Sequence, residues 1–359
     1  MSDATVKAHI RTVRRQMSEE KISALIVTKP ANVTYTTGFS GDDSWALITK
    51  GGVYLLTDSR YIEQAKKQSP DCRIIERAGP LTEAAAKLLK QLKSVRTVTI
   101  EKSTSLADFE KLREKIKGRI RTVADIIEKL RAGKDGNEIT GIKKAAQIAA
   151  EALEKTLKYI KPSVTENELA GALDFEIRKL GAKSSFETII AFGANASRPH
   201  HQPGTRKLRK NDTVLIDFGV QYKNYCCDLT RCFAVGRCSA FYRKVYQVVT
   251  EAQAAAIATV RAGVEIKKVD AAARRVISKY NLPVYGHGTG HGLGLEVHEK
   301  PVISAKAKGR LKAGMVVTIE PAVYIPGKLG IRIEDDILVT ERGYKILSGG
   351  FAHVFLPWG

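Results

Sequence analysis

Two acidic residues in an apolar hairpin constrain the fold of this chain more than any other feature of its sequence. Asp217 follows the apolar run 214–216, and Asp228 lies further on, beyond a short polar turn. A turn centred on residues 222 and 223 would place the two carboxylates opposite each other in antiparallel strands. A buried, unpaired carboxylate is costly, and like charges on one sheet face repel. The pattern therefore predicts a hairpin that holds a cation between Asp217 and Asp228.

Two further carboxylates occur in apolar strands, and a histidine-rich loop precedes them. Glu320 ends GMVVTIE, and Glu334 lies within GIRIEDDILVT. The loop GHGTGHGLGLEVHEKP (286–301) contains three of the seven histidines of the chain, and His291 is the middle one. Four carboxylates and one imidazole suit two divalent ions that share bridging carboxylates, with Mn favoured and Co or Zn as alternatives. Two such ions can activate water and polarise a carbonyl group, which indicates hydrolysis.

Each of these five positions has a common structural explanation when it is taken alone. A buried aspartate is usually capped or ion-paired, and a histidine in a glycine-rich loop is usually structural or exposed. Five such residues in the apolar strands of one segment are much harder to explain in this way. A metal centre is therefore the preferred interpretation.

The first 131 residues alternate between strand and helix patterns. Apolar, β-branched runs predict strands, and the amphipathic runs between them predict helices. The expected strands are 23–29, 45–50, 51–58 and 96–102, and the expected helices are 60–68, 81–95 and 105–116. This alternation predicts an α/β domain with a largely parallel sheet. The polar, turn-rich segment AGKDGNEIT (132–140) marks the start of a second domain, 132–359.

The second domain has a different pattern, in which helices are grouped apart from strands. Thr165 and Glu168 form a capping box at the start of one predicted helix. Helices are expected at 136–160, 165–181 and 241–260, strands at 185–196, 213–222 and 226–236, and strands with glycine loops over the last 75 residues. This grouping predicts an α+β domain whose helices flank a mostly antiparallel sheet.

Composition excludes several classes of protein. Hydrophobic residues make up 43% of the chain and charged residues 27%, which is typical of a globular protein. The chain contains no apolar run of about 18 residues and no apolar signal-peptide core, so we expect a cytoplasmic protein without a membrane partner. The net charge of +21 is spread along the chain, with +8 in residues 1–130 and +13 in the remainder. A solvated basic surface is therefore expected, and no nucleic-acid partner.

The cysteines do not form a recognisable framework. Their number, five, is odd, and four of them cluster while Cys72 stands alone. The spacing of the cluster (Cys226, Cys227, Cys232 and Cys238) matches no usual zinc site. Free thiols packed within strands are therefore expected, and the role of the Cys226, Cys227 and Cys232 group stays open.

Taken in order, the motifs DFG with Asp228, GHGLGLEVHE, TIEPAVY and GIRIEDD resemble those of the creatinase, prolidase and aminopeptidase P family of metallopeptidases. The segment NVTYTTGFSGDDSWALIT…LLTDSRYIEQA is similar to the N-terminal domain of that family, so the resemblance covers nearly the whole chain. It implies a creatinase-like α/β domain over 1–131, with roles in substrate access and oligomer contacts. It also implies a pita-bread catalytic domain with a curved, mostly antiparallel sheet over 132–359, and a homodimer.

The same resemblance implies a role for each site residue. The implied metal ligands are Asp217, Asp228, His291, Glu320 and Glu334, which would hold two divalent ions per subunit. The implied catalytic residues are His200 at the substrate or leaving group, His298 at the tetrahedral intermediate and Glu320 as proton acceptor. His287 is implied to line the proline pocket, and Arg332 and Tyr324 to lie on the substrate side or directly behind the metal ligands. His201 is the alternative to His200, and a surface role is the alternative for His298.

The resemblance implies an Xaa-Pro aminopeptidase, which removes the first residue from a proline-containing peptide. The alternative is a prolidase, which cleaves only Xaa-Pro dipeptides, and the active-site residues do not separate the two. Closure of the site by the N-terminal domain of a second subunit would separate them, with Asp42, Asp43, Asp58 and Arg60 as candidate contacts to substrate termini. A non-catalytic nucleic-acid-binding relative is disfavoured because all five metal ligands are present. Cys227 and Cys232 replace expected small polar residues, which could make the site sensitive to oxidation.

Overall fold

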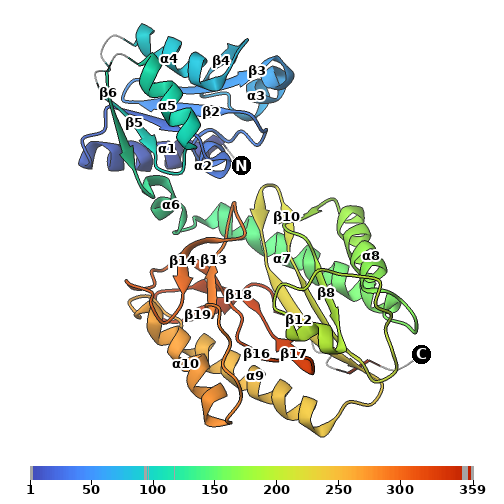
Figure 1. Cartoon of the computed structure of the whole chain (residues 1–359). Helices are drawn as coiled ribbons and strands as arrows, with labels where there is room; N and C mark the ends of the chain where they lie inside the picture. Colours follow the sequence, from blue (N-terminus) through green and yellow to red (C-terminus); the bar gives the residue numbers. More distant parts are fainter. Residues whose placement is uncertain (1–2, 93–94, 96, 117, 350–354, 357–359) are drawn as a thin grey trace. The chain divides into compact units, whose positions relative to one another are not determined.

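The computed structural model describes residues 3–92, 95, 97–116, 118–349 and 355–356. The chain divides into two compact units, residues 1–131 and residues 132–359, and each has its own sheets and core (Figure 1). Among the helices of these described ranges, none is both long enough and apolar enough to cross a membrane.

The first unit is built on one mixed sheet. Its described strands are β1 (Ala24–Val27), β2 (Trp45–Thr49), β3 (Val53–Asp58), β4 (Arg73–Arg77), β5 (Thr97–Glu101) and β6 (Arg119–Val123), in the order β4-β3-β2-β1-β5-β6. Strand β2 runs antiparallel to both of its neighbours, whereas the other neighbouring pairs are parallel. The prediction of a largely parallel sheet is therefore wrong around β2. The turn of three residues between β2 and β3 is too short for the crossover that parallel pairing requires.

Helices cover this sheet, and several of them lack a clear sequence signal. The described helices are α1 (Asp3–Glu19), α2 (Pro30–Thr37), η1 (Ser59–Tyr61), α3 (Ile62–Gln68), α4 (Leu81–Gln91), α5 (Leu106–Lys115) and α6 (Ile126–Arg131). The sequence PANVTYTT of α2 is rich in residues that favour strands. The hydroxyl groups of Thr34, Thr36 and Thr37 each donate to a backbone carbonyl in the preceding turn of the helix. Burial of six of its eight residues stabilises this helix against its propensity.

The second unit contains two larger antiparallel arrangements of strands. One sheet has the order β20-β12-β9-β8, and the other has the order β14-β13-β15-β18-β19. Their strands are β8 (Ile189–Phe192), β9 (Thr213–Phe218), β12 (Leu229–Val235), β13 (Gly290–Gly292), β14 (Glu299–Ile303), β15 (Val316–Ile319), β18 (Asp335–Val339), β19 (Tyr344–Ile346) and β20 (Phe355–Leu356). Apart from the parallel pair β12 and β20, the pairs in these two sheets are antiparallel, as predicted.

Smaller elements complete this unit. The hairpin of β16 (Ala322–Ile325) and β17 (Leu329–Arg332) connects β15 to β18. A short sheet has the order β11-β10-β7, with β7 (Lys183–Ser184), β10 (Val220–Tyr222) and β11 (Tyr225–Cys226). An isolated antiparallel bridge between Thr230 and Glu334 links β12 to the residues just before β18. This bridge joins the two larger sheets at one point along their length.

Both faces of the strands β8, β9 and β12 are buried, one against helices and the other against helices and the hairpin of β16 and β17. The helices are α7 (Gly136–Thr156), η2 (Leu157–Tyr159), α8 (Glu166–Lys179), η3 (Gly193–Ser197), α9 (Ala240–Thr259) and α10 (Ile266–Lys279). Ile216 and Phe233 pack in a core cluster with α7 and α8, whereas Leu215 and Cys232 belong to the cluster with α9 and α10 (Figure 1). Burial on both faces explains why residues 214–216 of β9 form an unbroken apolar run rather than an alternating one. The predicted capping box of Thr165 and Glu168 is confirmed at the start of α8.

The hairpin that carries Asp217 and Asp228 has a different register from the predicted one. Asp217 pairs with Thr230, so the predicted direct pairing of Asp217 with Asp228 is wrong by two residues. The turn is formed by Lys223 and Asn224, whose φ angles are 47° and 73°. Asparagine tolerates positive φ and favours this kind of tight hairpin turn. A shift of two residues keeps a side chain on the same sheet face, so the two carboxylates still face the same way.

Candidate metal centre

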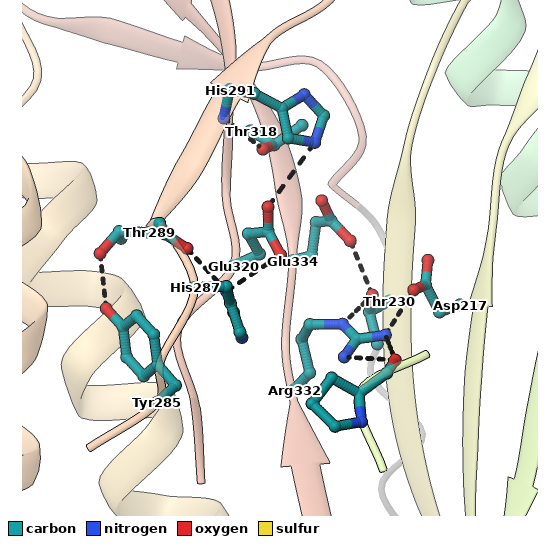
Figure 2. Close-up of polar contacts among 12 residues, drawn as sticks. Asp217, Thr230, Tyr285, His287, Thr289, His291, Thr318, Glu320, Arg332 and Glu334 are labelled. Carbon is teal, nitrogen blue, oxygen red and sulfur yellow. Dashed lines mark hydrogen bonds and ion pairs between the residues drawn. The ribbon is translucent and has the colours of Figure 1, made fainter. Parts of the chain in front are cut away.

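Strands from both larger sheets carry the five predicted metal ligands. Asp217 lies in β9 and Asp228 immediately before β12, whereas His291 lies in β13, Glu320 directly after β15 and Glu334 between β17 and β18. Figure 2 shows the side chains of His291, Glu320, Glu334 and Asp217 directed toward one another from these strands. The structure therefore gathers residues that are more than one hundred positions apart in sequence.

The distances within this group are short enough for shared ligation of a cation. His291 Nε2 lies 3.6 Å from Asp228 Oδ2 and 3.6 Å from Glu320 Oε1. One potential ligand atom from each of Asp228, His291 and Glu334 falls within 4.8 Å of the others. Asp217 belongs to the same cluster, because its charge contributes to the raised pKa values of Asp228, Glu320 and Glu334.

The cluster carries more negative charge than its protein neighbours balance. Burial, together with the surrounding carboxylates, raises the pKa of Asp228 well above its usual range. Burial also raises the pKa of Glu334 well above its usual range and that of Glu320 to about 7, and neighbouring carboxylates add to both shifts. Asp228 Oδ1 is buried and has no hydrogen-bond partner within the described residues. A divalent cation would relieve all of these costs, so the residues fit a metal.

His291 is oriented for ligation by its backbone surroundings. Its Nδ1 lies 3.0 Å from the carbonyl oxygen of Gly292, an acceptor, so Nδ1 carries the proton and Nε2 presents its lone pair to the carboxylates. Burial, with a contribution from His298, lowers the pKa of His291 to about 4. The ring is therefore neutral at physiological pH, which is the form that binds metals.

The glycines beside His291 serve the packing of the strands. A Cβ on Gly290 would lie 1.9 Å from the carbonyl oxygen of Thr318 in β15. Glycine is therefore required at this position for β13 to approach its neighbouring strand. The close contact at Gly290 is thus with protein backbone.

Three polar residues that the sequence analysis did not select support the ligands. Thr230 Oγ1 donates to Glu334 Oε2 over 2.6 Å, and Asp336 Oδ2 accepts a hydrogen bond from the backbone amide of Asp228. Thr318 Oγ1 accepts a hydrogen bond from the backbone amide of His291. Thr230 and Thr318 each lie two positions from a predicted ligand in an apolar strand and so share its face. That spacing is the sequence signal that would have identified them.

Arg332 and Tyr324 form a buried chain of hydrogen bonds rather than an open substrate surface. Arg332 is 4% exposed, and its Nη2 forms an ion pair with Asp217 Oδ2. Its Nη1 donates to the Tyr324 hydroxyl group. Its Nε donates to Thr230 Oγ1 over 3.1 Å (Figure 2). Arg332 therefore contacts Asp217 directly and contacts Glu334 through Thr230.

The predicted histidines occupy different positions around the cluster. The hydroxyl oxygen of Tyr324 lies 3.2 Å from His287 Nε2, and His287 Nδ1 lies 3.8 Å from Glu320 Oε2. Burial lowers the pKa of His287 to about 4. The ring of His298, an exposed residue, meets that of His291 edge-on, with 4.4 Å between the ring centroids.

His200 and His201 differ sharply in their surroundings. His200 is exposed, and its charge contributes to the low pKa of His287, so it lies within electrostatic range of the cluster. His201 is buried, and its Nε2 lies 2.9 Å from Glu166 Oε2. This difference supports His200 as the member of the pair that faces the site.

The cysteines near the cluster are free thiols, and burial disfavours their reactive thiolate form. All five cysteines are free, as predicted. Burial raises the pKa values of Cys226 and Cys232 to about 12, and that of Cys227 well above the usual range. The thiolate is the reactive form, so these environments oppose the oxidation sensitivity considered from the sequence.

Three of the four candidate contacts to substrate termini, Asp43, Asp58 and Arg60, form a network of ion pairs with Arg77. Arg60 and Arg77 each contact both Asp43 and Asp58. These side chains therefore partner one another within their own unit.

Comparison with known proteins identifies the family. The model of metallopeptidase family M24 matches residues 140–341, and the model of the creatinase/prolidase N-terminal domain matches residues 9–132. The chain belongs to metallopeptidase family M24. The predicted family and the predicted pita-bread fold behind a creatinase-like N-terminal domain are thus both confirmed.

Similar proteins match this chain over nearly its full length. An uncharacterized peptidase of Bacillus subtilis is 37% identical over 94% of this chain and 97% of its own length. The solved structure of an Xaa-Pro dipeptidase from Bacillus anthracis is 35% identical with a TM-score of 0.93, covering 98% of this chain and all of that one. An X-Pro aminopeptidase from Thermotoga maritima is 34% identical with a TM-score of 0.88, covering 96% of this chain and 99% of that one.

Proposed function

We propose that this protein is a metal-dependent peptidase that hydrolyses the bond between an N-terminal residue and a following proline. The observation that carries the proposal is the convergence of four carboxylates and one neutral imidazole on a buried site with unbalanced negative charge. The similarity to an Xaa-Pro dipeptidase and an X-Pro aminopeptidase supports proline at the second position of the substrate.

The proposed ligands are Asp217, Asp228, His291, Glu320 and Glu334, and they would hold two divalent ions. When bound, such ions would supply Lewis acidity toward the scissile carbonyl group and lower the pKa of water at the site. Oxygen-rich ligands with one imidazole favour Mn, with Co or Zn as alternatives. Arg332 would fix the orientation of Asp217 through their ion pair.

Glu320 is the proposed proton acceptor. Its carboxylate lies between His291 Nε2, at 3.6 Å, and His287 Nδ1, at 3.8 Å. A carboxyl group with a pKa of about 7 can take up and release a proton near neutral pH, which is the requirement for a general base. Ligation by a cation would lower this pKa, so the protein surroundings and the ion act on Glu320 in opposite directions.

The histidines around Glu320 are proposed to act on the substrate. His298 would donate a hydrogen bond to the negative charge that develops on the carbonyl oxygen. His287, packed against Tyr285 and Tyr324, would form one wall of the proline pocket. His200 would contact the substrate or the departing nitrogen. Removal of the His298 ring should then lower kcat while the metal content stays unchanged.

Substrate length separates the two proposed activities. The experiment is to load the purified protein with Mn and follow alanine release from Ala-Pro and from Ala-Pro-Ala-Ala, with a chelator control. Ala-Ala and Ala-Ala-Ala-Ala serve as matched controls for the proline requirement. Cleavage of the longer peptide would establish the aminopeptidase, whereas cleavage of Ala-Pro alone would establish the dipeptidase. Absence of cleavage with Mn, Co and Zn would overturn the peptidase proposal.

Dipeptidase activity is supported as well as aminopeptidase activity, because the chain is similar to the Xaa-Pro dipeptidase from Bacillus anthracis. Restriction to dipeptides requires a wall beyond the proline pocket, and we propose that a second subunit in a homodimer supplies it. Measurement of molecular mass in solution by light scattering tests this part of the proposal. A monomer that cleaves only dipeptides would contradict it.

A further inference from the structure

A buried carboxylate outside the metal centre organises the segment that carries His200. Glu166, the first residue of α8, is fully buried. Its Oε1 accepts hydrogen bonds from the backbone amide of Phe192 and from Asn195 Nδ2, both over 2.8 Å. Its Oε2 lies 2.9 Å from His201 Nε2 and accepts a hydrogen bond from the backbone amide of Gly204 over 3.1 Å.

These contacts determine the protonation of both partners. Burial alone would raise the pKa of Glu166, but the hydrogen bonds from Asn195, His201 and Phe192 lower it below its ordinary value. Glu166 is therefore ionised at neutral pH and can only accept hydrogen bonds. It follows that His201 Nε2 carries a hydrogen and donates a hydrogen bond to Glu166. This contact sets the orientation of the His201 ring.

The four donors lie at the two ends of one segment. Phe192 and Asn195 stand at its start, and His201 and Gly204 stand at its end, so a single carboxylate ties both ends of the segment 192–204 together. Without Glu166, two backbone amides at these ends would lose their acceptors.

Contacts to β17 and to the loop before it hold the middle of the same segment. A Cβ on Gly330 would lie 1.7 Å from the carbonyl oxygen of Ala196, so the backbones of η3 and β17 touch there. The backbone amide of Gly327 donates to Ser197 Oγ. The Arg332 guanidinium group reaches the carbonyl oxygen of Pro199 over 3.5 Å. His200 therefore stands between Pro199, which contacts Arg332, and His201, which contacts Glu166.

We propose that Glu166 is a positioning residue for His200, acting through His201 and through the closed segment 192–204. This proposal rests on the proposed function, because it assigns Glu166 a role in Xaa-Pro hydrolysis. Glu166 would have this role without contacting the substrate. It also gives His201 a defined task, which is to anchor its neighbour rather than to take part in the reaction. Arg332, which contacts both Asp217 and Pro199, connects this segment to the metal ligands.

The first test is the variant Glu166→Gln, with Glu168→Gln as its matched control. Either orientation of the new amide turns one pair of accepted hydrogen bonds into contacts between donors. Glu168 lies two residues away in the same helix terminus, is exposed, and belongs to a capping box that glutamine also satisfies. We expect Glu166→Gln to lower kcat for Ala-Pro by about tenfold or more with unchanged metal content, and Glu168→Gln to retain the wild-type rate.

A double-mutant cycle distinguishes positioning from a general structural role. If Glu166 acts through His200, the loss in the double variant Glu166→Gln with His200→Ala should equal the loss in His200→Ala alone. Losses that multiply would overturn the proposal, because Glu166 would then act independently of His200. Wild-type kcat for Glu166→Gln would also overturn it.

A second pair of variants keeps the test decisive if Glu166→Gln does not fold. His201→Ala removes the donor to Glu166, whereas His201→Gln retains an N–H group at the end of a side chain. We expect His201→Ala to lower kcat and His201→Gln to restore most of it; equal losses in both would overturn the proposal. Failure of the wild-type protein to cleave any Xaa-Pro peptide would instead count against the proposed function. In that case NMR of the His200 ring in wild type and Glu166→Gln tests the positioning itself, and an unchanged His200 spectrum would overturn it.

Discussion

Glu166 and Glu334 are both almost completely buried, yet their surroundings shift their pKa values in opposite directions. Glu166 is surrounded by four hydrogen-bond donors, and its pKa is lowered. Glu334 receives a hydrogen bond from Thr230 and stands among other carboxylates, and its pKa is raised well above the usual range. Protein groups alone satisfy the first site, whereas the second needs an added positive charge. The contrast separates a residue that shapes the structure from one that is prepared for a ligand.

The largest expected effect comes from removal of a ligand. Asp228→Asn should lower kcat/KM for Ala-Pro by more than about hundredfold, because loss of a direct ligand exceeds the effect of losing an outer contact. Elemental analysis of the purified variant should show less bound metal than in the wild type. Glu166→Gln is the control that keeps its metal. A fully active, fully loaded Asp228→Asn variant would remove Asp228 from the proposed centre.

Metal should stabilise the protein, and more so as the pH rises. The Glu320 pKa is raised from 4.5 to about 7, so in the metal-free protein its contribution to stability is present below about pH 4.5 and is lost as the pH rises through about 7. Free Mn at about one hundred times its Kd should add about 2.7 kcal/mol. Thermal unfolding with Mn and with chelator, followed over this pH range, should show a widening gap in Tm. A constant gap would contradict the raised pKa.

Metal binding at neutral pH should release protons. Glu320, Asp228 and Glu334 have raised pKa values, so the metal-free site holds protons that a cation must displace. Calorimetric titrations of the metal-free protein in two buffers with different ionisation enthalpies should give a release of about one proton or more per chain. Heats that do not depend on the buffer would show that the cluster is already ionised.

Thr230→Val should have a smaller effect on metal binding, because Thr230 supports the ligand Glu334 rather than being a ligand itself. The change removes the donor to Glu334 and the acceptor for Arg332 with little change in shape. We expect a loss of metal affinity of about tenfold with the fold intact. Thr213→Val, at the start of the neighbouring strand β9 and four residues before Asp217, is a matched control. An unchanged metal affinity would show that Thr230 does not orient Glu334.

The smallest expected effect concerns the buried thiols. Cys226, Cys227 and Cys232 should remain unmodified when the native protein is treated with iodoacetamide near pH 8, because burial keeps them protonated. Mass spectrometry of peptides from the treated protein checks this directly, and the treated enzyme should retain its activity. Rapid labelling of Cys227 would reveal opening of the strands beside Asp228.

Local signals carried much of the prediction. Carboxylates in apolar strands identified the four acidic candidate ligands, because a buried charge has few explanations other than a partner or a metal. The capping box of Thr165 and Glu168 identified the start of α8 for a similarly local reason. The predicted pairing of Asp217 with Asp228 was wrong because the turn is centred on Lys223 and Asn224, where asparagine adopts a positive φ, rather than on residues 222 and 223.

The features that the sequence did not predict depend on contacts between distant segments. Helix α2 forms from residues that favour strands because its tertiary surroundings bury them. Thr230 meets Glu334 across 104 positions, and Glu166 meets His201 across 35. The contact of Arg332 with Asp217 spans 115 positions and could not be read from local spacing. Such pairings become visible only when the strands are placed in space.

The bridge between Thr230 and Glu334 has a consequence for the synthesis of the protein. The proposed ligands begin at Asp217 and end at Glu334, so a chain still emerging from the ribosome has made the whole first unit and strands β7 to β17 before the last of them appears. A fragment that ends with β17 lacks Glu334 and the strand β18 that follows it. Contacts between residues so far apart in sequence also form slowly during folding. The newly made chain can therefore complete the proposed centre only after Glu334 has been added, when strands β1 to β17 have already been made.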